Sequence, residues 1–152
     1  MKKDKTSIFI ENVLNKMHIK VKNDTLKLLV QIFKFGIVGG IATIIDWIVY
    51  YIVYKFLHVN PLIANILSFL VSVIYNYSAS VKWVFDVNKN KSKKKMFVEF
   101  ITFSVIGLLI TELLLHIGIN ILNMNAMLTK VIATLIVMVF NFITRKIFLE
   151  KW

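Results

Sequence analysis

Four continuous apolar stretches dominate this chain of 152 residues. They cover residues 32–54, 61–81, 97–122 and 126–144. A helix needs about 20 residues to cross the hydrocarbon core of a bilayer, and here apolar residues surround each stretch instead of forming one stripe. A soluble domain of this length cannot bury four such helices. The sequence therefore predicts an all-α integral membrane protein with four transmembrane helices.

Basic residues distinguish the two sides of the membrane. The chain contains 19 Lys and Arg against 8 Asp and Glu, a formal net charge of +11. Only Lys55 and Lys130 lie close to the short connections at 58–60 and 123–125. The positive-inside rule then places both termini and the middle loop in the cytoplasm, in a multi-pass protein of the cytoplasmic membrane. Because the bilayer accounts for the charge, we expect no nucleic-acid partner.

Residues 1–31 are expected to form a separate basic segment, and residues 32–152 the membrane domain. Apolar residues recur in the first segment at helical spacing: Ile10, Val13, Leu14, Met17 and Val21. This pattern predicts an amphipathic helix on the cytoplasmic leaflet, in contact with anionic membrane lipids. A partly disordered basic tail is the alternative.

An internal repeat relates the two halves of the membrane domain. Residues 60–76 and 125–141 share their spacing at an offset of 65, and each ends in an asparagine, Asn76 or Asn141. Upstream, Phe35-x3-Gly39-x3-Thr43 matches residues 103–111 at an offset of 68. Each half contains two spans, so the prediction is two parallel two-helix repeats related by an axis along the membrane normal.

Each predicted span has one face of small or polar residues at helical spacing. These are Gly39, Thr43, Asp46 and Tyr50; Ala64, Ser68, Ser72, Asn76 and Ser80; Ser104, Glu112, His116 and Asn120; and Thr129, Ala133, Val137, Asn141 and Arg145. Polar groups in hydrocarbon are costly and tend to face a cavity or another helix. We therefore expect four helices around a shared polar centre. Whether one chain or a homo-oligomer builds that centre stays open.

Two carboxylates, Asp46 and Glu112, lie near mid-membrane in corresponding helices. A charge there costs at least about 2.5–3.5 kcal/mol on insertion scales. They are interpreted as a ligand site or proton relay, with Lys130 near the outer boundary as a partner for one of them. A buried pair that fixes the helix register is the alternative.

Further candidates lie near the cytoplasmic ends of the spans. Asn76 and Asn141 are suited to bind a ligand headgroup or to tie helices together. Lys82 and Arg145 are placed to meet a phosphate, or to snorkel as ordinary interfacial cations. Gly36-x3-Gly40 indicates close helix packing. Without cysteine, a disulfide scaffold is excluded. No motif for nucleophilic, phosphate-loop or zinc chemistry occurs, so we expect neither an enzyme nor a cofactor or metal.

The chain resembles the GtrA-like family of small four-helix membrane proteins over about residues 33–150. The resemblance rests on the run from Phe35 to Thr43 with Asp46 after it, on Asn76-Tyr77 leading to 82–85, and on Lys130 leading to Asn141-Phe142 and 145–146. Where the first half has Trp83-Val84-Phe85, the second has 147–149 as Ile-Phe-Leu, which departs from the usual ending.

The resemblance implies translocation of a polyprenyl-phosphate-linked sugar from the cytoplasmic to the outer leaflet. Membrane glycosyltransferases would make and use this lipid, and the acceptor would be a cell-surface polymer, with wall teichoic acid preferred. The substrate-binding candidates are Asp46, Glu112, Asn76, Asn141, Lys130, Lys82, Arg145 and Asn65. Two other functions stay open: a scaffold for a polyprenyl-phosphate glycosyltransferase that transports nothing itself, and a small proton-coupled cation exporter.

Overall fold

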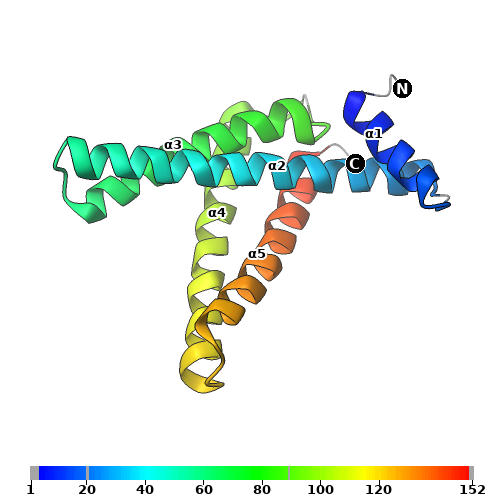
Figure 1. The fold of residues 1–152 in the computed structure, drawn as a ribbon. Coiled ribbons are helices and arrows are strands. Elements are labelled where there is room, and N and C mark those ends of the chain that lie inside the picture. The colour runs from blue at the N-terminus through cyan, green and yellow to red at the C-terminus, as the bar shows by residue number, and fades with distance from the viewer. Residues whose placement is uncertain (1–3, 20, 89, 151–152) are drawn as a thin grey trace. The chain divides into compact units, whose positions relative to one another are not determined.

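The computed structural model describes residues 4–19, 21–88 and 90–150, without the side chains of 61–62 and 126–127. Over these residues the regular elements are helices: α1 (Lys5–Lys16), α2 (Asn23–Tyr51), α3 (Pro61–Ala79), α4 (Lys93–His116) and α5 (Ala126–Leu149) (Figure 1). Helices α2 to α5 are long and apolar enough to cross a membrane. The prediction of an all-α membrane protein with four spanning helices is confirmed.

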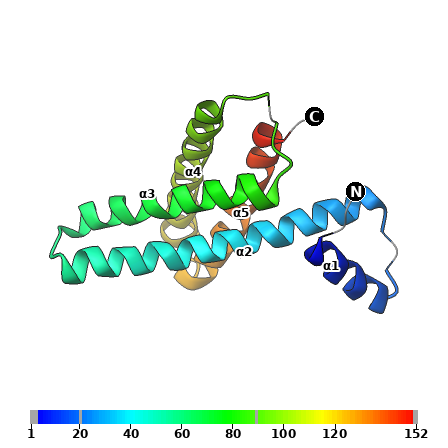
Figure 2. The ribbon, with the colours of Figure 1, turned by 90° about the horizontal axis from the view of Figure 1, so that it is seen from above.

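The chain divides into two compact units, Met1–Val84 and Phe85–Trp152, and we describe each by itself. The first contains α1 and a hairpin of α2 and α3. The second is a hairpin of α4 and α5. Figures 1 and 2 show the second helix of each hairpin running back along the first. We call the end of each hairpin near residues 57–60 or 122–125 the turn end, and the opposite, lysine-rich end the basic end.

The helices extend further at the basic end than the apolar stretches predicted. Helix α2 begins at Asn23 and not at residue 32, α4 begins at Lys93 and not at 97, and α5 continues past 144 to Leu149. Backbone N–H and C=O groups near the membrane surface gain by staying hydrogen-bonded within a helix. The helices therefore continue beyond the last apolar residue, and their lysines extend from the final turns.

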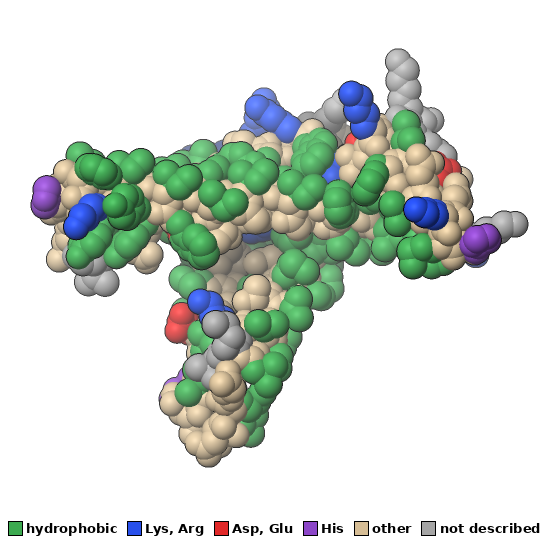
Figure 3. All heavy atoms as spheres, viewed as in Figure 1, with side chains coloured by type: hydrophobic (Ala, Val, Ile, Leu, Met, Phe, Trp, Pro, Cys, Tyr) green, Lys and Arg blue, Asp and Glu red, His purple; other side chains and the backbone are tan. Residues whose placement is uncertain are grey.

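Large apolar side chains cover the outside of both hairpins, as Figure 3 shows for one face of the molecule. Trp47 on α2 is 69% exposed and Leu109 on α4 is 62% exposed. In water such a surface would drive aggregation, whereas lipid tails solvate it. The exposed surface thus agrees with the membrane assignment made from length and composition.

The turn ends of the two hairpins have the same backbone structure. Helix α2 ends in the π-helical turn η1 (Ile52–Phe56), and α4 ends in η3 (Ile117–Ile121). The N–H of Leu57 donates to the carbonyl at the start of η1, at 3.3 Å, and the N–H of Leu122 donates to the carbonyl at the start of η3, at 3.0 Å. Every one of these positions is repeated at an offset of 65.

A residue in the left-handed region follows each π-helical turn. His58 has φ 54° and Asn123 has φ 51°. This region is uncommon for residues other than glycine, although Asn and His adopt it more readily than most. The shared geometry at both turns supports the predicted repeat.

The same offset of 65 continues through the first helix of each hairpin. Phe35 and Phe100 are both buried, as are Ala42 and Gly107. The pairing of Phe35 with Phe103 at an offset of 68 is therefore displaced by about one helical turn. Since α2 and α4 are continuous α-helices up to their π-helical turns, the turns determine one register for the whole repeat.

The small-residue face of α3 lies in the contact between α2 and α3. Ala64, Ser68, Ser72 and Ser80 are all buried. Ser68 Oγ donates to the carbonyl of Asn65 at 3.1 Å, and Ser72 Oγ likewise bonds to a carbonyl of its own helix. These hydroxyls are satisfied locally, so this part of the predicted polar centre is a packing surface.

Close packing in the second hairpin depends on glycines other than those predicted. A Cβ added at Gly118 would lie 2.3 Å from Thr129 Cγ2, and one at Gly107 would lie 3.0 Å from Asn141 Oδ1. At Gly36 and Gly40 an added Cβ meets nothing within 4 Å among the described residues. Gly36-x3-Gly40 therefore makes no close contact with the described residues, and the close packing predicted there stays a prediction.

Helix α1 confirms a helix in the first segment, although it ends at Lys16, before Met17 and Val21 of the predicted pattern. It begins after Asp4, whose Oδ1 accepts the Ser7 N–H at 2.9 Å and the Ser7 hydroxyl at 2.7 Å. Aspartate at this position satisfies an N–H group that a helix start otherwise leaves unbonded. None of the residues of α1 is buried.

Candidate functional site

A buried cation lies near the basic end of the α4–α5 hairpin. Arg145 on α5 is 5% exposed, and its guanidinium carbon lies 3.9 Å from the centre of the Phe100 ring on α4. Its Nη2 donates to Ser104 Oγ at 3.0 Å, and this hydroxyl donates to the Phe100 carbonyl at 2.9 Å. Stacking and hydrogen bonding together fix the plane of the guanidinium, which is the group best matched to a phosphate.

Asn141 lies one turn from Arg145 on α5. Its side chain is held against Gly107 on α4, where the missing Cβ makes room for the amide. The amide oxygen, Oδ1, is buried and has no hydrogen-bond partner among the described residues. A buried acceptor without a donor is costly, and in native proteins such a group often serves a function. The pair of Arg145 and Asn141 is our candidate site.

The equivalent place in the first hairpin is filled differently. Asn76 corresponds to Asn141, and Ser80 to Arg145, at the offset of 65. Here Ser80 is fully buried and its hydroxyl donates to Asn76 Oδ1 at 3.2 Å. The first hairpin thus satisfies its asparagine internally, and the candidate site belongs to the second hairpin alone.

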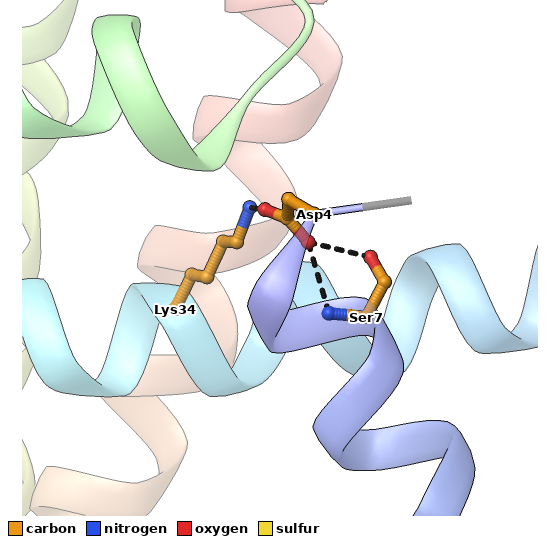
Figure 4. A network of polar contacts seen from close by, with 3 residues as sticks. All are labelled: Asp4, Ser7 and Lys34. Carbon is orange, nitrogen blue, oxygen red and sulfur yellow. Dashed lines mark hydrogen bonds and ion pairs between the residues drawn. The ribbon is translucent and has the colours of Figure 1, made fainter. Parts of the chain in front are cut away.

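The basic end of the first hairpin contains a second buried cation, Lys34 on α2. Its ammonium forms an ion pair with Asp4 Oδ2 and lies 5.2 Å from the centre of the Trp83 ring. Figure 4 shows Asp4 between this ammonium and Ser7. The hydrogen bond from Lys34, with those from Ser7, lowers the pKa of Asp4 to about 2. The carboxylate is therefore ionised at neutral pH.

The second hairpin has an opposite arrangement of charge at the matching positions. Glu99 takes the place of Lys34, and Phe148 that of Trp83. The cation comes from Lys91, whose Nζ lies 2.5 Å from Glu99 Oε2 and 5.7 Å from the centre of the Phe148 ring. The same Nζ donates to the Phe148 carbonyl at 2.7 Å. Both ends of this ion pair come from the second unit.

The two mid-span carboxylates have different surroundings. Asp46 on α2 is half-buried, and its Oδ1 is buried without a hydrogen-bond partner among the described residues. Glu112 on α4 is exposed. At the offset of 65, Asp46 corresponds to Thr111, whose hydroxyl donates to the Gly107 carbonyl at 3.0 Å. The two carboxylates lie in corresponding helices but not at corresponding positions.

The remaining predicted site residues are exposed. Lys130 and Asn65 lie on α5 and α3, and Lys82 lies in η2 (Ser80–Val84). In the described part of the chain Lys130 forms no ion pair with Glu112, although both belong to the second hairpin. Of the eight predicted residues, the structure brings Asn141 and Arg145 together within one unit. No group of three His, Cys, Asp or Glu side chains that could hold a metal occurs among the described residues.

Sequence reasoning missed the partners of these groups. Phe100 and Ser104 position Arg145, while Asp4 and Trp83 surround Lys34. The offset of 65 was the signal that could have identified the aromatic partners. It aligns Phe100 with Phe35 and Phe148 with Trp83. Asp4 had no such signal, because it precedes the repeated region.

The comparisons with known proteins agree with this architecture. The model of the GtrA/DPMS transmembrane domain matches residues 34–149. A cell wall teichoic acid glycosylation protein, GtcA, from Listeria monocytogenes is 28% identical over 118 residues, which is 76% of this chain and 81% of that protein. A GtcA from L. monocytogenes serovar 1/2a is 25% identical over 118 residues, with the same coverage. No solved structure matches the chain.

Proposed function

The chain belongs to the GtrA/DPMS transmembrane domain family, and from this premise we propose that it takes part in glycosylating cell wall teichoic acid. The two GtcA proteins, each matched over 81% of its length, support this polymer as the acceptor. The match includes all four spanning helices, so the proposal concerns a membrane step. Within it, the chain moves a polyprenyl-phosphate-linked sugar from the cytoplasmic to the outer leaflet.

The observation on which this proposal depends is the pair of Arg145 and Asn141. A guanidinium held over the Phe100 ring has its N–H groups in the planar arrangement that a phosphate accepts. The unpartnered Oδ1 of Asn141, one turn away, accepts a hydrogen bond from a sugar hydroxyl. A lipid-linked sugar offers both groups within a short distance. The apolar outer surface leaves the polyprenyl tail in the bilayer beside the protein.

The mid-span carboxylates extend this proposal along the helices. Asp46 and Glu112 would accept hydrogen bonds from sugar hydroxyls during passage. Lys130, Lys82, Asn76 and Asn65 are the remaining proposed contacts, and the Oδ1 of Asn76 already accepts the Ser80 hydroxyl of its own hairpin. We assign no bond-making or bond-breaking step to this chain. Membrane glycosyltransferases make the lipid-linked sugar on one side and use it on the other.

The proposed direction of transport requires the basic ends in the cytoplasm. The chain contains no cysteine, so single cysteines introduced at exposed Ser92 and Asn123 report on the two sides separately. A membrane-impermeant maleimide added to intact cells should label the cysteine at 123 and spare the one at 92. The reverse pattern would overturn the proposed orientation.

Translocation is tested with the purified full-length chain in liposomes that contain a polyprenyl-phosphate hexose. We expect the wild-type protein to move the lipid between leaflets. The single variants R145K and N141A should reduce the rate most strongly. The double variant D46N/E112Q tests the carboxylates. The variant K22Q removes an exposed positive charge outside the proposed pathway and should leave the rate unchanged.

A folded wild-type chain that moves no lipid would contradict translocation by this chain alone. Co-purification with a glycosyltransferase would then support the scaffold function. Equal rates for wild type, R145K and N141A would instead leave translocation in place and remove the candidate site from its pathway.

A further inference from the structure

Lys34 is a buried cation whose anionic partner comes from outside the hairpin. Its side chain is 10% exposed, and it lies at the basic end of α2 with the Trp83 ring beside it. The partner, Asp4, precedes α1 and is 30 residues away in sequence. Bringing an ammonium out of water is costly unless an anion accompanies it. The hairpin by itself therefore presents a cation that requires an anion.

The contact that supplies this anion is accessible to solvent on the Asp4 side. The Asp4 side chain is 42% exposed, and no residue of α1 is buried. A second contact of α1 with α2 is between the rings of Phe9 and Phe33, whose centres are 6.3 Å apart and which are both exposed. The Asp4 carboxylate is thus open to exchange with other anions, because solvent reaches it. A competing anion of higher charge could therefore replace Asp4.

The second hairpin lacks such an exchangeable anion. Glu99, at the position of Lys34, is paired with Lys91 inside the same unit. A cation paired with an anion from outside its hairpin therefore occurs at Lys34 and not at the matching Glu99. This difference indicates a specific site and not a general property of the repeat.

We propose that Lys34 and Trp83 form a binding site for the phosphate of a membrane lipid, and that Asp4 closes this site while no lipid is bound. A lysine beside an interfacial tryptophan meets a lipid headgroup at the depth where its phosphate lies. Binding of the phosphate displaces Asp4 and releases α1 from α2. The site goes beyond the proposed sugar translocation, because it is argued from α1 and the first hairpin and uses no residue of the candidate site.

The test uses the full chain in nanodiscs of phosphatidylcholine, with cysteines introduced in place of Phe9 and Phe33. Since the chain has no other cysteine, a short bis-maleimide reports only on α1 contacting α2. Adding phosphatidylglycerol or polyprenyl phosphate to the nanodiscs should lower the yield of cross-link in proportion to the lipid. Unchanged yields with both lipids, or a decrease with inorganic phosphate alone, would overturn the proposal.

Binding is measured separately by titrating each lipid into the detergent-purified chain and counting bound lipids by native mass spectrometry. D4N keeps a good helix cap but loses the charge, so we expect the lipid to bind roughly two- to fivefold more tightly. K34Q should abolish this binding and K34R should retain it. D24N and K22Q, which remove exposed charges at the start of α2, are the matched controls. A D4N variant that binds no better than wild type would contradict closure by Asp4.

The two lipids separate the sources of the phosphate. Equal binding supports a site for anionic phospholipids, and preference for polyprenyl phosphate supports a site for the transported lipid. A chain that binds lipid phosphate at Lys34 but moves no lipid-linked sugar would leave this site in place and contradict the proposed function.

Discussion

Gly107 on α4 and Asn141 on α5 are matched in shape: a Cβ at residue 107 would lie 3.0 Å from Asn141 Oδ1 and 3.2 Å from its Nδ2. The glycine thus admits an amide into the contact between the two helices. The amide oxygen obtains no hydrogen bond there among the described residues. An apolar residue would be the simpler way to fill this space. The asparagine is therefore better explained by a ligand than by stability.

Replacing Asn141 with alanine should separate function from stability. Because its Oδ1 has no partner, we expect the free energy of unfolding, measured by SDS titration, to change by less than about 1 kcal/mol. Translocation of lipid-linked sugar should fall roughly three- to tenfold, the value of one hydrogen bond to a ligand. N76A is the matched control, and because Asn76 accepts the Ser80 hydroxyl it should cost stability. A large loss of stability in N141A with normal translocation would contradict this assignment.

Gly118→Ala should destabilise the second hairpin. The added Cβ would lie 2.3 Å from Thr129 Cγ2, a distance that forces the backbones apart, and such overpacking costs about 1–3 kcal/mol. The double variant G118A/T129S removes the clashing methyl group and keeps the hydroxyl that donates to the Asn125 carbonyl. It should recover most of the lost free energy of unfolding. Gly36→Ala, at an open position, should cost nothing.

Arg145→Lys should lower both stability and translocation. Lysine keeps the positive charge but loses the flat contact with Phe100 and the paired geometry of the guanidinium. We expect a loss of about 1–2 kcal/mol in the free energy of unfolding, from the cation–π contact and the bond to Ser104. S104A removes the hydroxyl alone and should cost less. A fully active R145K would show that charge alone is sufficient at this site.

The contact between α1 and α2 should weaken only in strong acid. Asp4 has an ordinary pKa of 3.8 and one of about 2 when docked, so its contribution is complete above about pH 4 and is lost as the pH falls through 2. Lys34 on α2 and Ser7 on α1 contact this carboxylate. The 9–33 cross-link should therefore persist at pH 4 and decline near pH 2.

Glu11 on α1 and Asp24 on α2 are further carboxylates of the two helices, so D4N provides the control for this experiment. Its cross-linking should be weak throughout and should not change between pH 4 and 2. A decline of equal size in D4N would assign the pH dependence to those other groups.

The sequence was sufficient to predict the helices, because apolar length and lysine placement are properties of single segments. It predicted the repeat correctly at 60–76 and 125–141, but placed Phe35 opposite Phe103 instead of Phe100. The common π-helical turns removed that error. Phe100 and Phe103 lie three positions apart on one helix, and the sequence alone does not distinguish which of them corresponds to Phe35. The position of the π-helical turn determines that it is Phe100.

The candidate site could be predicted only in part. Arg145 and Asn141 were identifiable as polar residues near a membrane boundary. The rotation of the helices about their axes decides the rest. It determines that Ser68 and Ser72 pack against α2 and that Asn141 Oδ1 has no hydrogen-bond partner among the described residues. Asp4 was not identifiable, because its partner lies 30 residues away and no periodic pattern connects them.

The offset of 65 also has a consequence for what one chain can recognise. Two identical hairpins would present the same residue twice at every matching position. Joined in one polypeptide, the two copies have diverged, with Lys34 opposite Glu99 and Ser80 opposite Arg145 in the alignment. The two hairpins of one chain therefore present different side chains at matching positions, so each can bind a group that the other does not. A homodimer of a single hairpin would keep the two halves identical.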